Sequence, residues 1–360
     1  MDTLAPQVIR PPAVILQPTT LCNLDCTYCY LPFRKLKNTM STEVLDAVAS
    51  GLAGWNEHGP TEIVWHGGEP MLVGAAGLDA MMARFDGLDV RHSIQTNGVL
   101  VDDAWCELFT RRSVHVGVSV DGPEEFNRYR LNLAGRPSWA QTMRGIAKLR
   151  ERDVPFSAIA VVSHPFPALA QEFYDFFAQL GCTSVGVNIE EQEGVNTRHT
   201  GRSTVRMADF WAALTTAWRA NPVIGVREIG YVLDHLARDR APGGRGIWVD
   251  PLPTVGWDGS VTLLSPEMAG FDSPEYGDFA CGNVLETPLP ALVDAGLRER
   301  WPTEFLAGVA RCREICTFFD FCGGGHPGNK YFEHGRFDVT ETDYCRNSKI
   351  ALLQGVRATL

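Results

Sequence analysis

Strand-forming and helix-forming segments alternate along the first 190 residues, and this alternation constrains the fold more than any other feature of the sequence. Short runs rich in apolar and β-branched residues predict strands at Val14–Pro18, Glu62–His66, Ser93–Asn97, Val114–Val120, Ser157–Val162 and Ser184–Glu190. Runs with helical periodicity predict helices at Thr42–Glu57, Ala75–Phe85, Asp103–Arg111, Trp139–Arg152 and Pro167–Leu180. Such alternation favours βαβ units, and strands this apolar can curl into part of a barrel. We therefore expect an α/β fold with a partial (β/α)6 barrel of the TIM type, whose chemistry gathers where the strands end.

The pattern changes after about residue 200. Two helical runs, about 204–219 and 226–239, precede the Pro- and Gly-rich stretch Ala241-Pro-Gly-Gly-Arg-Gly246. Asp258-Gly259, between apolar runs, predicts a β-hairpin. The remaining sequence is rich in Gly and Cys and predicts irregular structure that ends in a short helix near Tyr344–Gln354. We expect a domain boundary near residue 240, which divides the chain into residues 1–240 and 241–360.

Composition excludes several classes of protein. The 360 residues are 45% apolar and 21% charged, which is enough to bury a large core and argues against disorder. No uninterrupted apolar run of about 18 residues predicts a membrane span, and the N-terminus lacks the apolar segment of a secretion signal. The net charge of −11, without a cluster of Lys or Arg, argues against nucleic acid and anionic membranes as partners. We expect a cytoplasmic protein.

Seven of the ten Cys residues fall in two clusters, and in a reducing compartment such clusters hold metal more often than disulfides. Cys22, Cys26 and Cys29 form a C-x3-C-x2-C motif just after the first predicted strand. Three thiolates on one loop can cap three corners of an iron–sulfur cubane and leave one iron open to a small molecule. A structural zinc site is the alternative, although no His or Cys follows nearby as a fourth ligand.

The C-x3-C-x2-C motif and the loops that follow it in order resemble the radical SAM enzymes. In that family, S-adenosyl-L-methionine binds the open iron of a [4Fe–4S] cluster, and its reductive cleavage gives a 5′-deoxyadenosyl radical that abstracts hydrogen. The resemblance covers residues 13 to about 200, although each loop alone is also compatible with a plain turn or a helix cap. It implies these cofactor-binding residues, with Arg128 competing for the last place: Tyr28, Gly67, Gly68, Glu69, Pro70, Gln95, Thr96, Asn97, Ser119 and Arg130.

The second cluster supplies four thiolates: Cys312, Cys316, Cys322 and Cys345. With the intervening turn Gly323-Gly-Gly325-His326-Pro327, it resembles the SPASM extension of peptide-modifying radical SAM enzymes, which carries auxiliary [4Fe–4S] clusters. That pattern normally has Cys for two clusters, whereas Leu263-Leu264-Ser265, Thr287 and His326 occupy positions where Cys is usual. The resemblance therefore implies one auxiliary [4Fe–4S] cluster in a small, irregular SPASM-like domain. Zinc remains the alternative for these thiolates. Cys281 is either packed or a spare ligand, and Cys106 and Cys182 fit the core.

Two further stretches narrow the reaction that the resemblance implies. The segment from Asn188 to Asn196 and the segment from Cys322 to Arg346 resemble SPASM maturases of ribosomal peptides, particularly those that form cyclophanes. This likeness implies a precursor peptide as substrate, abstraction of a side-chain hydrogen and a C–C cross-link to an aromatic ring. It also implies an electron donor such as flavodoxin or ferredoxin. The candidate catalytic bases are carboxylates near the expected barrel mouth: Asp121, Glu190, Glu191 and Glu193.

Two other functions stay open. An anaerobic sulfatase-type formylglycine maturase shares the Gly67-Gly-Glu-Pro70 and Ser119-Val-Asp-Gly-Pro123 features, but normally has both auxiliary clusters. A zinc-stabilised, non-catalytic peptide-binding module is the alternative of another class. Because few residues precede residue 13, we expect a leader peptide to bind the barrel or the SPASM-like region.

Overall fold

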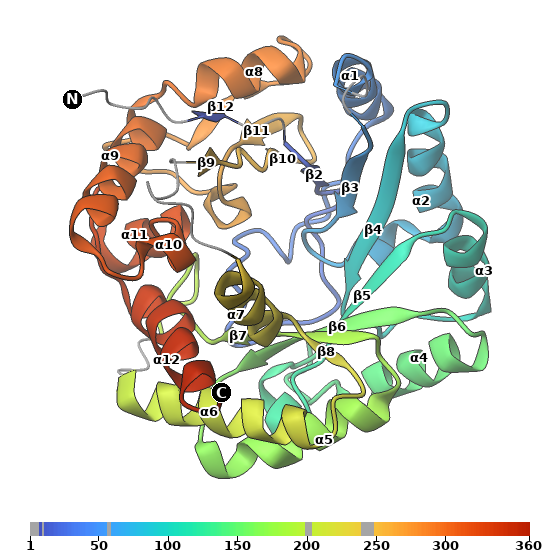
Figure 1. The fold of residues 1–360 in the computed structure, drawn as a ribbon. Helices are drawn as coiled ribbons and strands as arrows, with labels where there is room; N and C mark the ends of the chain where they lie inside the picture. The colour runs from blue at the N-terminus through green and yellow to red at the C-terminus, as the bar shows by residue number, and fades with distance from the viewer. Residues whose placement is uncertain (1–6, 9–10, 56–58, 199–203, 239–247) are drawn as a thin grey trace.

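One curved sheet organises the molecule. The computed structural model describes residues 7–8, 11–55, 59–198, 204–238 and 248–360. In this part of the chain, ten strands form a sheet in the order β12-β11-β10-β2-β3-β4-β5-β6-β7-β8. A separate short pair joins β1 (Gln7–Val8) to β9 (Trp248–Val249). Figure 1 shows that the large sheet curls and that the C-terminal helices close the ring beside it.

The predicted strands form the centre of this sheet. They are β2 (Ala13–Leu16), β3 (Thr61–Trp65), β4 (Val90–Thr96), β5 (His115–Ser119), β6 (Phe156–Val162) and β7 (Ser184–Ile189). Each pairs in parallel with the next along the chain. This arrangement confirms the predicted α/β partial barrel. It also brings the carboxyl ends of these strands to one rim, where the loops that follow them meet.

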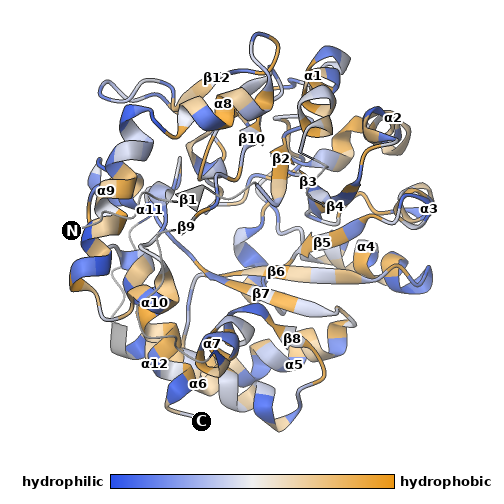
Figure 2. Ribbon diagram, turned by 45° about the horizontal axis from the view of Figure 1, so that its top comes forward, coloured by the Kyte–Doolittle hydropathy of each residue, from blue (hydrophilic) through white to orange (hydrophobic). Residues whose placement is uncertain are grey.

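Five helices cover the outer face of these strands: α1 (Thr42–Ala53), α2 (Ala75–Met82), α3 (Asp103–Arg111), α4 (Trp139–Glu151) and α5 (Ala170–Leu180). Their ends follow local capping. The Asp102 carboxylate accepts a hydrogen bond from Trp105 N at 3.1 Å, and Ser41 Oγ accepts one from Val44 N. Apolar residues predominate along β6 and β7, while the helices show both apolar and polar residues (Figure 2). The core therefore lies between the sheet and this helical layer.

The C-terminal region extends the sheet. β10 (Thr254–Val255) pairs in parallel with β2 and antiparallel with β11 (Ser260–Thr262), and β12 (Ala280–Asn283) pairs with β11. The β10–β11 connection is the predicted hairpin, in which Gly259 takes a φ of 88°. At the other edge, α6 (Thr204–Ala220) leads to β8 (Gly225–Val226) and then α7 (Arg227–Ala237). The boundary predicted near residue 240 lies outside the described residues, so the division into two domains stays a prediction.

The expectation of irregular structure beyond the hairpin is wrong. This region forms α8 (Leu289–Gly296), α9 (Arg300–Ile315), α10 (Phe319–Cys322), α11 (Pro327–His334), a π-helical turn (Cys345–Ile350) and α12 (Ala351–Arg357). Glycines that suggested loops instead allow close packing. A Cβ on Gly308 would lie 2.9 Å from Phe337 O, and one on Gly355 would lie 2.4 Å from Ala208 O. The predicted terminal helix is present, with its first turn wound as a π-helix.

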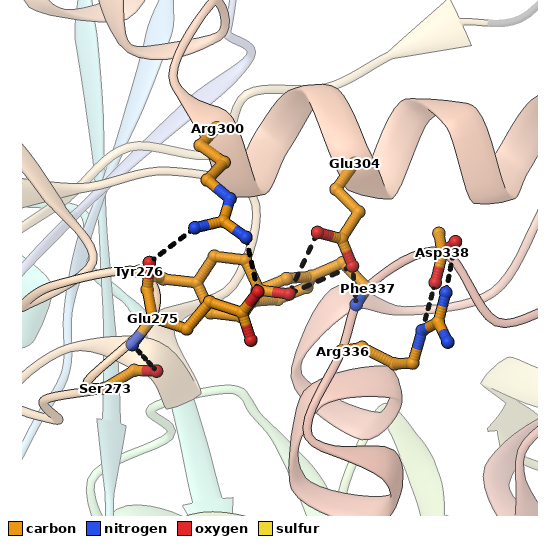
Figure 3. Close-up of polar contacts among 8 residues, drawn as sticks. All are labelled: Ser273, Glu275, Tyr276, Arg300, Glu304, Arg336, Phe337 and Asp338. Carbon is orange, nitrogen blue, oxygen red and sulfur yellow. Dashed lines mark hydrogen bonds and ion pairs between the residues drawn. The ribbon is translucent and has the colours of Figure 1, made fainter.

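A polar network fixes α9 against the neighbouring loops (Figure 3). The Tyr276 hydroxyl donates to the Glu304 carboxylate at 2.9–3.0 Å, and the same carboxylate accepts from Phe337 N at 3.0 Å. Arg300 binds Glu275 and lies 5.2 Å from the centre of the Tyr276 ring. Since α9 carries Cys312 and ends beside Cys316, this network holds the second Cys cluster in place. Within the described residues, no helix combines the length and apolarity that crossing a membrane requires.

Candidate active site

A cavity of about 350 Å³ lies where the parallel strands end. Its wall combines the loops after β2, β3, β4, β5 and β7 with residues of the C-terminal region. The residues predicted from the sequence that line it are Cys22, Cys26, Tyr28, Cys29, Gly68, Glu69, Gln95, Thr96, Asn97, Ser119, Arg130, Glu190, Glu191 and Glu193. Gly67, Pro70 and Asp121 are not part of its wall. The barrel thus brings together side chains from far along the sequence, although the role of each stays a prediction.

The three Cys of the first cluster lie on a tightly held loop. Cys22 N donates to Arg34 O at 2.8 Å and Cys29 N donates to Cys26 O at 3.1 Å. Asp25, within the loop, pairs with Arg34 at 2.7 Å and with Lys35 at 2.8 Å. Burial raises the pKa of Cys22 to about 12 and that of Cys26 to about 11. These thiols therefore become thiolates only when a cation compensates the buried negative charge.

The chemistry of this donor set fits a cluster better than a single ion. Among the residues that the structure describes, no group of three or more His, Cys, Asp or Glu side chains is arranged to hold a metal ion. A cubane does not require its thiolates to converge on one point, because each binds a different iron. Cys22, Cys26 and Cys29 share one cavity and bring no fourth protein thiolate, so they fit a [4Fe–4S] cluster with an open iron.

Gly67 and Gly68 let the loop after β3 pack directly on the Cys loop. Their φ angles are 101° and 20°, and a Cβ on Gly68 would lie 2.3 Å from Leu21 O. Glu69 N donates to the same Leu21 carbonyl at 2.8 Å. Side chains are excluded here because backbone meets backbone next to Cys22. This contact accounts for both glycines, and for the position of Glu69 at the cavity wall.

We predict that Gly68→Ala disrupts the Cys loop. The added methyl group clashes with two carbonyl oxygens of the loop and also strains the backbone, so we expect a loss of at least about 1–3 kcal/mol in the free energy of unfolding. Urea unfolding and the iron content after anaerobic reconstitution measure the effect. Gly54→Ala is the matched control, because Gly54 has a φ of −71° and open space around it. Equal stability and iron content in the two variants would contradict the prediction.

The buried Glu69 carboxylate joins two strand ends. It accepts hydrogen bonds from Met71 N at 3.1 Å, Thr96 Oγ1 at 2.7 Å and Asn97 N at 2.8 Å. Burial raises its pKa, and the hydrogen bonds from these donors oppose the shift. Pro70 starts the short 3-10 helix Pro70–Val73 that supplies the Met71 donor. Glu69 is therefore held rigidly, with Pro70 in a supporting position away from the cavity.

Polar side chains on the next strand ends continue this wall. Gln95 Nε2 donates to Ser119 Oγ at 2.8 Å, which links β4 to β5. Asn97 Nδ2 donates to Asn23 Oδ1 at 2.7 Å and lies 3.9 Å from Cys22 Sγ. The strand ends thus connect to the Cys loop through fixed hydrogen bonds, which pre-organises the wall around a polar ligand.

Tyr28, Asp121 and Arg130 form a buried network beside the Cys loop. The Tyr28 hydroxyl donates to Asp121 Oδ2 at 2.5 Å and accepts from an Arg130 N–H at 2.7 Å. The other Asp121 oxygen accepts from Val161 N at 3.0 Å and lies 3.5 Å from the Arg130 guanidinium. Asp121 is only 1% exposed, and burial raises its pKa. It is therefore placed to orient Tyr28 and Arg130 instead of reaching a substrate. Of the two competing arginines, Arg130 lines the cavity and Arg128 is exposed.

The opposite wall is acidic. Glu191 Oε2 accepts a hydrogen bond from Asn329 Nδ2 at 2.6 Å. The His326 ring lies between two carboxylates, 3.9 Å from Glu193 and 3.8 Å from Glu267. Burial and the neighbouring carboxylates raise the pKa of Glu191 to about 8 and that of Glu193 well above its usual range. Burial lowers the pKa of His326. This wall can therefore hold protons near neutral pH and exchange them with a bound group.

Glu190 differs from its neighbours on this wall. It lies 3.4 Å from the Arg198 guanidinium, which neutralises its charge. Arg198 also donates to Thr27 Oγ1 at 3.0 Å and so ties the loop after β7 to the Cys loop. Glu190 therefore has a positioning role in the geometry, whereas Glu191 and Glu193 have no arginine partner within ion-pair distance in the described structure.

The acidic wall makes stability depend on pH. The pKa of Glu191 is about 8 in the folded protein and about 4.5 in the unfolded chain, so folding favours its protonated form. This contribution is complete at acidic pH and is lost as pH rises through about 8. We predict that the urea midpoint falls between pH 7 and 8.5, a range in which His326 is already neutral. Glu191→Gln is expected to flatten this dependence; an unchanged slope would contradict the assignment.

Several cavity residues had no assignment from the sequence. The Tyr30 hydroxyl and His66 Nε2 are hydrogen-bonded at 3.0 Å, and both residues line the cavity. Glu267, Asn329 and Tyr344 come from the C-terminal region. Tyr344 and Asn329 lie in stretches that carry the family resemblance, so a signal for them existed. Glu267 has none, because only the fold of the chain brings it beside His326.

The second Cys cluster is gathered as predicted. Its four Cys line one small cavity of about 20 Å³: Cys312, Cys316, Cys322 and Cys345. Cys281 lies elsewhere, packed against Gly296, with its thiol 3.3 Å from Val261 O. Cys106 and Cys182 are buried in the core, as expected. His326 is directed to the larger cavity and is not among the residues around the thiols.

Comparison with known proteins adds sequence relatives to this geometry. The model of the radical SAM superfamily matches residues 16–167. A serine-type anaerobic sulfatase-maturating enzyme of Bacteroides thetaiotaomicron is 34% identical over 350 residues, which cover 89% of this chain and 84% of that enzyme. The corresponding enzyme of Klebsiella aerogenes is 33% identical over 86% of this chain and 77% of its own length. An uncharacterised Synechocystis protein is 34% identical over 92% of this chain and 88% of its own length.

Solved structures share the fold. The enzyme anSMEcpe with bound AdoMet has a TM-score of 0.77 at 19% identity, covering 96% of this chain and 97% of that one. Streptococcus suis SuiB, bound to its precursor peptide SuiA, has a TM-score of 0.66 at 15% identity, covering 93% of this chain and 76% of that one. Both likenesses extend beyond the barrel into the C-terminal region.

Proposed function

This chain belongs to the radical SAM superfamily, in the group that contains the anaerobic sulfatase-maturating enzymes, and we propose that it oxidises a side chain of a peptide bound in the cavity described above. One observation carries the proposal: a single cavity joins the three-Cys loop and its polar wall to an acidic wall that can accept protons. The sequence relatives support oxidation of a serine or cysteine side chain to formylglycine as the first candidate reaction.

The residues on the Cys side of the cavity fit the cofactors of this superfamily. We assign Cys22, Cys26 and Cys29 to a [4Fe–4S] cluster, and the adjacent wall to S-adenosyl-L-methionine. Glu69 offers an anion for the amino group, and Arg130 offers a cation for the carboxylate. When bound, these groups supply the electron and the radical that removes a hydrogen atom from a carbon. The hydrogen-bonded wall of Gln95, Asn97 and Ser119 would orient the ligand and exclude water.

The acidic wall completes the oxidation. After a hydrogen atom leaves the β-carbon, conversion to a carbonyl or a new bond requires the loss of one proton and one electron. Glu191 lines the cavity, and its raised pKa suits a group that accepts a proton near neutral pH. Glu193 and His326 lie beside it and could pass the proton onward. The second Cys cluster would hold the auxiliary [4Fe–4S] group that receives the electron.

A cyclophane-type cross-link is the second candidate. The departures from the two-cluster Cys pattern at Ser265, Thr287 and His326 favour it, because the sulfatase maturases normally retain that pattern. The structural likeness to SuiB adds only that a precursor peptide can bind a protein of this fold. In both reactions the chain would act on a ribosomally made peptide, with flavodoxin or ferredoxin as electron donor.

The test is an anaerobic assay of the reconstituted enzyme with two kinds of peptide. One contains the serine or cysteine segment of a sulfatase, and the other is encoded by a small open reading frame beside this gene. Oxidation of serine and formation of a cross-link both remove two hydrogen atoms, so mass alone does not separate them. A hydrazide reagent labels only the aldehyde, whereas fragmentation stops at a cross-link. Cleavage of S-adenosyl-L-methionine without change in either peptide would count against the proposal.

A further inference from the structure

Lys330 is a buried cation without a partner. It lies on α11 and is only 1% exposed, and its Nζ has no hydrogen-bond partner in the described structure. No carboxylate lies within ion-pair distance of it among the residues described. Burial of an ammonium group without a hydrogen-bonding or charged partner is strongly unfavourable. The site therefore lacks a group that would compensate this charge.

The surroundings of Lys330 show what kind of group this is. Its side chain lines the small cavity with the four Cys of the second cluster, and its electrostatic neighbours are the thiols of Cys312, Cys322 and Cys345. Gly325 packs against its stem, since a Cβ there would lie 3.4 Å from Lys330 Cε. The Phe305 ring, 4.9 Å from Nζ, provides a cation–π contact but no counter-charge. The fold thus directs the ammonium group at the thiols and holds it there.

We propose that Lys330 is the counter-cation of the metal–thiolate cluster that Cys312, Cys316, Cys322 and Cys345 bind, and that it raises the reduction potential of that cluster. Four thiolates make an iron–sulfur cluster anionic, and reduction adds a further negative charge. A nearby fixed cation stabilises the reduced form more than the oxidised form, and it can also donate hydrogen bonds to sulfur. Lys330 thereby favours electron acceptance by this cluster. The inference rests on the auxiliary cluster of the proposed function but not on the peptide reaction.

The experiment isolates the second cluster in the full-length chain. The triple variant Cys22→Ala, Cys26→Ala, Cys29→Ala removes the first site and serves as parent. In this background, iron, sulfide and zinc are measured after anaerobic reconstitution, and the midpoint potential is followed by EPR during a redox titration. Lys330→Met removes the charge with little change in volume. Lys330→Arg retains the charge.

We expect Lys330→Met to lower the equilibrium constant for reduction at least tenfold, which is 59 mV for a one-electron couple. Lys330→Arg should restore most of this shift. Lys349→Met is the graded control, because Lys349 lines the same cavity but is half-buried and lies over the Tyr344 ring. Lys37→Met removes a fully exposed charge and should leave the potential unchanged.

Each outcome decides the role of Lys330. Loss of iron in Lys330→Met but not in Lys330→Arg would also support it, since the cluster would then need the charge to assemble. Full iron content with an unchanged potential in Lys330→Met would overturn the proposal. Equal loss of iron in both variants would overturn it in favour of packing. A parent without iron would overturn both the auxiliary-cluster assignment and this inference, whereas the peptide assay tests the overall function separately.

Discussion

Cys26→Ala is expected to abolish reductive cleavage of S-adenosyl-L-methionine, with a fall of at least about a thousandfold, or about 4 kcal/mol in the barrier. Cys26 is buried on the loop that also carries Cys22 and Cys29, and no other Cys lines that cavity. Two remaining thiolates cannot hold a cluster that needs three. The measurement is 5′-deoxyadenosine formed per minute with dithionite as reductant, together with iron content and the visible spectrum.

Cys182→Ala is the control for this substitution. Cys182 is equally buried, but it lies in the barrel core with its thiol 3.6 Å from Phe177 O. It should retain its iron and its activity, because loss of one sulfur atom from the core costs only stability. Cleavage at the normal rate in Cys26→Ala, or a zinc-only protein in the unsubstituted chain, would contradict the radical SAM assignment.

The barrel could be predicted because its signals are local. Strand ends, helix starts and turns depend on residues close in sequence: Asp102 caps α3 where its helical pattern begins, and Gly259 forms the hairpin turn. The C-terminal helices were missed for the opposite reason. Gly308 and Gly355 interrupt the helical pattern, and their value lies in close contacts with backbone far along the chain.

The site shows the same division. The Cys spacing indicated both clusters, and the order of the loops indicated the polar wall. The sequence did not indicate that Asp121 is enclosed by Tyr28, Arg130 and Val161 N, nor that Glu267 approaches His326. Those contacts depend on how the loops pack across the rim. Lys330 is a sharper case, because nothing in its neighbourhood along the chain predicts a buried ammonium group aimed at thiols.

Glu191→Gln is expected to separate hydrogen abstraction from product formation. The cofactor-binding wall is unchanged in this variant, so S-adenosyl-L-methionine cleavage should stay within a few-fold of normal. Modified peptide should fall by about 10²–10⁴-fold, the usual contribution of a positioned base. The amide keeps the size of the side chain and can still accept the hydrogen bond from Asn329, which limits any structural cause.

The pH profile gives an independent check on Glu191. A proton acceptor must be ionised, so product formation by the unsubstituted enzyme should rise with pH and level off above about 8, the pKa of this group. Glu191→Gln should remove this rise. Glu190→Gln is the matched control, because Glu190 lines the same cavity but its charge is neutralised by Arg198. If Glu190→Gln abolished the product and Glu191→Gln did not, the proton acceptor would be the residue beside Arg198, and the acidic wall at His326 would instead have to serve in binding the peptide.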